Sequence, residues 1–148
     1  MSAAPASPAP AAAPNDGSIP LRAVVFGKAG CDKCKVLRRR VEDLVRRTAA
    51  GRMEPVYVDV ETEPGLVAFC RAEVLNPQRI PALLFERRDE ATGRYAPLPR
   101  PAGESAPPDG TRLPRILGLQ TDYSDEGRGV IPPRAIAAEL QQALAAAP

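Results

Sequence analysis

The feature that most restricts the fold of this chain is a pair of cysteines, Cys31 and Cys34, placed between a short apolar run and a long amphipathic stretch. Residues Ala23–Phe26 are all apolar, which is typical of a strand covered on both faces, and Gly27–Gly30 form a loop after it. The apolar residues that follow recur at helical spacing, with charged residues between them. We therefore expect Cys31 to lie at the N-terminus of a helix that follows a buried strand. The apolar face of this helix comprises Leu37, Val41, Leu44, Val45 and Thr48.

A second strand and a second helix follow in the sequence. Pro55–Val60 predicts the strand, and Thr62 can cap a helix that carries Pro64 in its first turn and ends at Asn76-Pro77. Cys70 lies on the apolar face of this helix, so we expect it to pack in the core rather than act as a third redox thiol. The residues of that face are Leu66, Phe69, Cys70 and Val74.

The rest of the chain predicts more strands and a last helix. Pro81–Glu86 is a buried-strand pattern, and a turn at Thr92-Gly93 joins it to a short strand over Arg94–Leu98, as in a hairpin. Arg115–Gln120 predicts a further short strand. The alternation of strand and helix patterns predicts an α/β fold. After two prolines, the final helix shows apolar residues at four-residue spacing, namely Ile136, Leu140 and Leu144.

Two segments lack the pattern of packed elements. The chain has 148 residues, enough for one domain, but 18 of them are prolines, which is far above average usage. Met1–Pro20 is mostly Ala, Pro and Ser, without the basic start and apolar run of a secretory signal, so we expect a disordered tail. Residues 99–129 are rich in Pro, Gly and polar residues, and we expect most of this segment to form an inserted, mobile loop. Residues 21–148 then form the single domain.

Composition excludes several classes of function. The chain has no histidine, which excludes Cys/His metal sites and any mechanism with an imidazole base. A formal charge of +2 does not indicate nucleic acid or an anionic membrane as the main partner. With no apolar run long enough to span a bilayer, we expect no membrane association and, by default, a cytoplasmic location. Three cysteines do not make the framework of a secreted disulfide-rich domain, so the pair Cys31 and Cys34 is interpreted as a motif.

The position of Cys31 favours thiol chemistry. Unpaired backbone N–H groups and the helix dipole stabilise a thiolate at a helix N-terminus, and Lys28 and Lys33 add positive charge, whereas the adjacent Asp32 opposes ionisation. Cys34, one turn further on, is spaced to attack a mixed disulfide formed at Cys31. Alone, a CxxC pair is also compatible with half a zinc site or a structural role, but a zinc site needs two more ligands. We expect no metal site here.

The segment from Val24 to Lys35 (VVFGKAGCDKCK) resembles the thioredoxin superfamily, and within it looks most like a glutaredoxin. A second match is Arg79-Ile80-Pro81, which is similar to the family's cis-proline element, in which the proline faces the CxxC and the preceding backbone pairs with substrate. The resemblance implies a central mixed sheet of about four strands flanked by three helices. It implies Cys31 and Cys34 as catalytic residues and Lys28, Ile80 and Pro81 as substrate-binding residues.

The chain departs from the family pattern at several positions. The central pair Asp32-Lys33 is neither the Gly-Pro of thioredoxins nor the Pro-Tyr of glutaredoxins. Gly30 and Val25 stand where thioredoxins carry a Trp and a buried acid, which disfavours thioredoxin proper. Lys28 matches a glutathione contact of glutaredoxins, and glutathione is a candidate reductant, but the Gly-Gly-x-Asp element that binds its glutamyl end is not recognisable, which argues against glutathione use.

Three functions are weighed on these grounds. The first is a monomeric thiol-disulfide oxidoreductase that needs no cofactor and acts on protein disulfides with a thiol reductant. The second is a non-catalytic interaction module of the same fold, with the 99–129 segment and a basic helix face as its partner surface. The third is Cu(I) binding through the sulfurs of Cys31 and Cys34. The basic residues of the first helix are interpreted as a solvated face; they are Arg38, Arg39, Arg40, Arg46 and Arg47.

Overall fold

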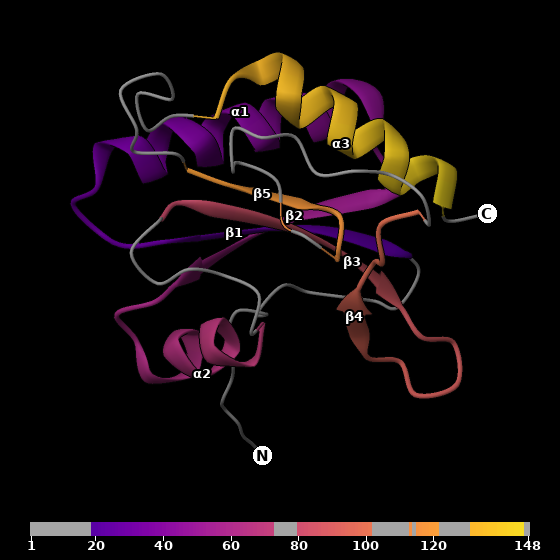
Figure 1. The fold of residues 1–148 in the computed structure, drawn as a ribbon, viewed down its shortest axis with the longest axis horizontal. Coiled ribbons are helices and arrows are strands. Elements are labelled where there is room, and N and C mark those ends of the chain that lie inside the picture. The colour runs from indigo at the N-terminus through magenta and orange to yellow at the C-terminus, as the bar shows by residue number, and fades with distance from the viewer. Residues whose placement is uncertain (1–18, 73–79, 102–112, 114, 122–130, 147–148) are drawn as a thin grey trace.

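The computed structural model describes residues 19–72, 80–101, 113, 115–121 and 131–146 (Figure 1). Most of the expected tail and the expected helix stop at Asn76-Pro77 lie outside these residues. None of the described helices combines the length and apolarity needed to cross a membrane. The elements in chain order are β1 (Leu21–Gly27), α1 (Asp32–Thr48), β2 (Met53–Asp59), α2 (Glu63–Arg71), β3 (Ala82–Arg88), β4 (Tyr95–Pro97), β5 (Gly118–Gln120) and α3 (Pro133–Ala146).

The strands form one mixed sheet in the order β2-β1-β3-β4. β1 runs parallel to β2 and antiparallel to β3. β4 pairs with the end of β3 at Glu86–Arg88, and β5 pairs with its start at Ala82–Leu84, both antiparallel. Since β1 occupies one edge of β3, the two short strands share the other edge and together fill the fourth position of the sheet. This strand order, with its helical crossovers, is a thioredoxin-like fold.

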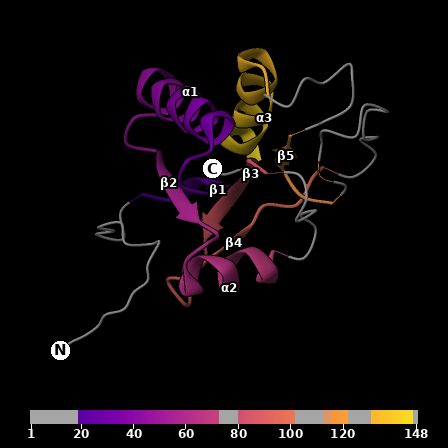
Figure 2. The ribbon, with the colours of Figure 1, turned by 90° about the vertical axis from the view of Figure 1, so that its left-hand side faces the viewer.

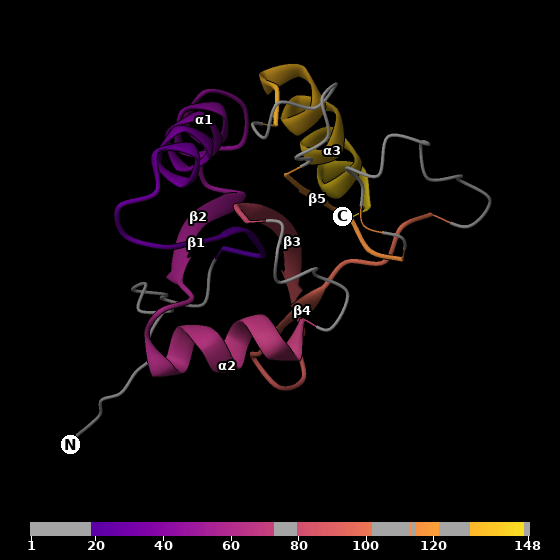
Figure 3. The ribbon, with the colours of Figure 1, turned by 60° about the vertical axis from the view of Figure 1, so that its left-hand side comes forward.

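The sheet is the middle of three layers. In Figures 1 and 2, α1 and α3 lie side by side over one face, and Figure 3 shows α2 beneath the other. Side chains of β1 alternate between the two faces, as a strand covered on both sides requires. Ala23 and Val25 join the core under α1 and α3, whereas Val24 and Phe26 pack with Phe69 of α2.

Helix α1 begins and ends close to the predicted positions. Cys31 is its N-cap residue, and the helix ends at Thr48, with the backbone N–H of Ala49 bonded to the carbonyl of Val45. Gly51 follows with φ of +83°, a conformation that glycine adopts without strain. Three predicted core residues of the helix are buried, Leu44 is half-buried, and Thr48 is exposed, with its hydroxyl donating to the Leu44 carbonyl. Ala49 takes the buried position expected of Thr48.

The buried face of α2 differs from the prediction. Gly65 and Phe69 are buried, whereas Leu66 is 52% exposed and Cys70 is exposed, so the predicted core role of Cys70 was wrong. The reason is close packing: a Cβ on Gly65 would lie 1.8 Å from the Asp59 carbonyl oxygen. The helix therefore turns its smallest residue toward β2, and the large residues beside it point outward. The predicted face residue Val74 lies outside the described residues.

The segment 99–129 is partly integrated into the fold. It contains β5, and its Leu113, Leu117 and Leu119 are fully buried. Arg100, 8% exposed, forms an ion pair of 2.8 Å with Glu139 of α3, which has no exposed surface. The same guanidinium donates to the carbonyls of Leu113 and Ile116, and the carboxylate accepts from the backbone N–H of Gly118. Residues 102–112, 114 and 122–130 of the expected loop lie outside the described part.

Candidate functional site

Cys31 and Cys34 are joined by a disulfide at the N-terminus of α1. The Cys31 sulfur accepts a hydrogen bond from the backbone N–H of Cys34 at 3.2 Å, which satisfies one of the free donors of the first turn. Cys31 is half-buried and Cys34 has no exposed surface. The prediction that Cys31 lies at the N-terminus of a helix after a buried strand is confirmed.

The loop between β1 and α1 brings Cys31 to this position. Gly30, directly before the disulfide, has φ of +76°, which a side chain would disfavour. Gly27, at the end of β1, has no room for a side chain, because a Cβ there would lie 2.6 Å from the Tyr57 hydroxyl and 2.8 Å from the Cys34 Cβ. The two glycines thus let the loop turn sharply while strand and helix pack against each other.

Ile80 and Pro81 lie at the same edge of the sheet as the disulfide. Phe26 of β1 pairs with Ala82 of β3, so the residues just before β3 lie beside the end of β1. The peptide bond between Ile80 and Pro81 is cis, and Pro81 is buried while Ile80 is half-buried. The role of these two residues in binding a substrate stays a prediction.

The Pro81 carbonyl is held by Thr121. Thr121 directly follows β5 and is fully buried. Its hydroxyl donates to the Pro81 oxygen at 2.7 Å and its backbone N–H donates to the same atom at 3.0 Å. Two hydrogen bonds on one carbonyl fix the backbone of the segment that precedes β3.

The charged groups near the disulfide are mostly solvated. The Lys28 side chain is exposed, and its backbone carbonyl accepts a hydrogen bond from the Tyr57 hydroxyl at 3.2 Å. Asp32 is exposed and Lys33 is half-buried. Burial, followed by the charge of Asp59, raises the pKa of Tyr57 above its usual value, while the nearby Arg38 acts in the opposite direction. Tyr57 is therefore protonated at neutral pH and donates its hydrogen bond.

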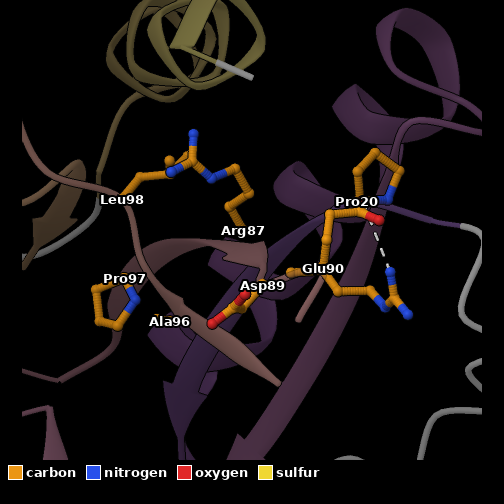
Figure 4. Close-up of a pocket in the computed structure, with 8 residues that line it drawn as sticks. Pro20, Arg87, Asp89, Glu90, Ala96, Pro97 and Leu98 are labelled. Atoms are coloured by element: carbon orange, nitrogen blue, oxygen red, sulfur yellow. Dashed lines mark ion pairs between the residues drawn. The ribbon is translucent and has the colours of Figure 1, made fainter. Parts of the chain in front are cut away.

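A hollow of about 630 Å³ lies elsewhere, at the other end of β3 (Figure 4). Pro20, Arg87 and Pro97 are among its lining residues, and two others, Arg88 and Glu90, pair with each other at 3.7 Å. The length of β3, about 20 Å, separates it from the end of the sheet that carries the disulfide. No cysteine lines it, so this hollow is not the site of thiol chemistry. Among the described residues, no group of three or more acidic or cysteine side chains gathers to hold a metal ion.

Sequence reasoning did not identify Gly27, Tyr57 and Thr121 as parts of the site. Tyr57 falls within the predicted strand Pro55–Val60 and Thr121 within the predicted 99–129 loop, and neither belongs to a motif. The sequence did hold one indication for Tyr57. It lies two residues before the end of β2, the strand that pairs in parallel with β1, and parallel strands end on the same side of the sheet, where Cys31 follows β1. For Thr121 no such signal existed, because its partner Pro81 is 40 residues away in sequence.

No known protein-family model and no curated protein sequence matches this chain. The solved structures that are similar at low identity include three thioredoxins. A chloroplastic thioredoxin z is 21% identical, with 85% of this chain and 80% of that one aligned and a TM-score of 0.48. Thioredoxin O2 from Arabidopsis thaliana, in its oxidized state, is 20% identical over 55% of this chain and 62% of its own, with a TM-score of 0.39.

The third is mitochondrial thioredoxin 3 from Saccharomyces cerevisiae, in its oxidized form. It is 18% identical over 54% of this chain and 65% of its own, with a TM-score of 0.37. The alignments with the Arabidopsis and yeast proteins thus span less than two thirds of each of those chains. These likenesses are distant, and the fold follows from the strand order and connections of this chain itself.

Proposed function

We propose that this chain is a thiol-disulfide oxidoreductase in which Cys31 is the nucleophile and Cys34 the resolving thiol. The observation that carries the proposal is the Cys31–Cys34 disulfide at the N-terminus of α1, in which Cys31 is half-buried and Cys34 is buried. A thiolate at this position is stabilised by the N–H groups of the first helical turn. Because Cys34 is buried and Cys31 only half-buried, Cys31 is the cysteine that a partner would reach first.

The reaction moves two electrons from the dithiol protein to a protein disulfide. The Cys31 thiolate attacks one sulfur of the substrate, the substrate S–S bond breaks, and the displaced thiolate takes up a proton. Cys34 then loses its proton and attacks the Cys31 sulfur of the mixed disulfide. This forms the Cys31–Cys34 disulfide and releases the second substrate thiol. A thiol reductant returns the pair to the dithiol state, and no bound cofactor takes part.

We propose that the backbone around Ile80 and Pro81 aligns the substrate. Two observations support this role. This backbone segment lies beside the end of β1 that leads to the disulfide, and two hydrogen bonds hold the Pro81 carbonyl. Lys28 has an exposed side chain three residues before Cys31 and is proposed as a further substrate contact. We propose that a thiol reductant recycles the chain, which would act as a monomer in a reducing, cytoplasmic setting.

The first test uses Cys31→Ser and Cys34→Ser with an insulin-type protein disulfide as substrate. We expect Cys31→Ser to abolish reduction, because the attacking sulfur is lost. Cys34→Ser should accumulate a mixed disulfide that mass spectrometry detects, because the resolving step cannot occur. Cys70→Ser is the matched control and should retain the wild-type rate, because Cys70 is exposed and lies on α2 rather than at the site. Retention of full activity in both active-site variants would contradict the proposal.

A second measurement is the reduction potential of the pair, from equilibration in a glutathione or dithiothreitol buffer followed by thiol alkylation. We expect one two-electron transition between roughly −300 and −120 mV, the range of working oxidoreductases. Failure to form the disulfide at any buffer ratio would favour a non-catalytic interaction module. Stoichiometric binding of Cu(I) by the reduced pair, with no reductase activity, would favour metal binding instead.

A further inference from the structure

Tyr57 links strand β2 to the loop that precedes Cys31. It pairs with Val25 of β1 in the sheet and packs against the core under α1 and α3. Its hydroxyl donates to the backbone carbonyl of Lys28 at 3.2 Å. Because Lys28 is three residues before Cys31, this hydrogen bond ties the middle of the loop to the sheet.

The same hydroxyl lies close to the buried sulfur of the pair. A Cβ built on Gly27 would be 2.6 Å from the Tyr57 oxygen and 3.0 Å from the Cys34 sulfur. The Tyr57 oxygen and the Cys34 sulfur therefore both lie next to Gly27, at the end of β1. The lack of a side chain at Gly27 is what allows the phenol and Cys34 to approach each other there.

The tyrosine ring is fixed from the helix side. The guanidinium of Arg38, on α1, lies 4.5 Å from the centre of the ring, in a cation–π arrangement. Burial is the largest cause of the raised pKa of the Tyr57 phenol; the charges of Asp59 and Glu61 also raise this pKa, and the charge of Arg38 lowers it. A protonated phenol held by a ring contact and a hydrogen bond is a rigid support.

We propose that Tyr57 is a positioning residue for the Cys31–Cys34 pair: its hydroxyl holds the Lys28 carbonyl and thereby keeps Cys31 at the helix N-terminus. The catalytic consequence rests on the proposed function, but the positioning itself concerns the reduced thiol alone. When the loop is released, the Cys31 sulfur moves away from the N–H groups of the first turn. The thiolate then loses part of its stabilisation, and the pKa of the Cys31 thiol rises.

The test compares Tyr57→Phe with Tyr95→Phe, a closely matched control. The Tyr95 hydroxyl also donates to a backbone carbonyl, that of Ile19 at 2.6 Å, and Arg22 lies over its ring at 3.8 Å. Tyr95 lies in β4, which pairs with the end of β3 far from the disulfide. Each substitution removes one hydroxyl from the same kind of surroundings, so their costs in stability are comparable, while only one hydroxyl contacts the active-site loop.

The measurement is the rate at which the reduced protein is alkylated at Cys31 as a function of pH, with Cys70→Ser as the common background. We expect Tyr57→Phe to move the profile to higher pH by about half a pKa unit, which slows alkylation roughly threefold at pH values below the pKa of the Cys31 thiol. Tyr95→Phe should follow the parent profile. Equal profiles for the two variants, or a parent Cys31 that titrates like a free cysteine, would overturn the inference.

This readout separates the inference from the proposed function, because alkylation needs no disulfide substrate. A shifted profile in a protein that reduces no disulfide supports the positioning role and overturns the oxidoreductase proposal alone. An unshifted profile in a protein that reduces disulfides overturns the positioning role alone.

Discussion

At the scale of single residues, the absence of a side chain at Gly27 has the most direct effect on the site. The glycine lies at the end of β1, where the Tyr57 hydroxyl and the Cys34 side chain both approach its backbone. Elements β1, β2 and α1 therefore meet at this glycine. A methyl group at Gly27 would force at least one of the two neighbours to move.

We predict that Gly27→Ala lowers the free energy of unfolding by about 1 to 3 kcal/mol, as overpacking of a core does. The double variant Gly27→Ala/Tyr57→Phe should recover part of this loss, because it removes the atom nearest to the new methyl group. Urea denaturation of the four members of this cycle measures both effects. Strictly additive losses would show that the phenol oxygen is not the atom that resists the substitution.

The positions of single residues were predicted correctly where they depend on the neighbouring sequence. They were predicted wrongly or missed where they depend on a contact with a residue far away in the sequence. The helical period after Cys34, together with the loop glycines before Cys31, was sufficient to place Cys31 at a helix N-terminus. Cys70 was misplaced because the apolar period of α2 contains both exposed and buried residues. The close approach of Gly65 to β2, which selects the buried face, depends on tertiary packing that a single sequence does not contain.

At the scale of elements, β5 connects the candidate substrate-binding backbone to the sheet. It has only three residues, but it pairs with the start of β3 and leads directly to Thr121. The sequence predicted a strand over Arg115–Gln120 without indicating its partner, since a short apolar run does not specify pairing. That Thr121 then reaches the Pro81 carbonyl is a consequence of the register between β3 and β5.

Thr121→Val tests this connection. Valine keeps the backbone N–H bond to Pro81 but loses the hydroxyl bond of 2.7 Å, so we expect a stability loss of about 1 kcal/mol. If the Pro81 segment aligns substrates, the variant should also show a raised KM for a protein disulfide, with the alkylation rate of Cys31 unchanged. Thr121→Ser, which restores the hydroxyl, should recover both values. An unchanged KM in a measurably destabilised variant would limit Thr121 to a structural role.

At the scale of the whole molecule, a buried ion pair joins the late part of the chain to the core. Arg100 follows β4, Glu139 lies in α3, and between them the carboxylate also accepts from the backbone of β5 at Gly118. This ion pair therefore connects the segment after β4, strand β5 and helix α3, although the sequence predicted an open loop between the first and the last of these. The composition did not indicate the pair, because the prolines and glycines around Arg100 are typical of irregular structure.

We predict that Glu139→Gln lowers the free energy of unfolding by about 3 kcal/mol, because it leaves the Arg100 side chain, which is 3% exposed, without its charged partner. The control is Glu42→Gln, which breaks the exposed Arg38–Glu42 pair and should cost less than about 1 kcal/mol. The site should respond only indirectly, because Glu139 accepts a hydrogen bond from Gly118 of β5, whereas the disulfide lies at the N-terminus of α1. We therefore expect Glu139→Gln to raise amide hydrogen exchange in β5 before it affects the first turn of α1. Equal costs for the two substitutions would mean that the carbonyls around Arg100 satisfy its charge without the carboxylate.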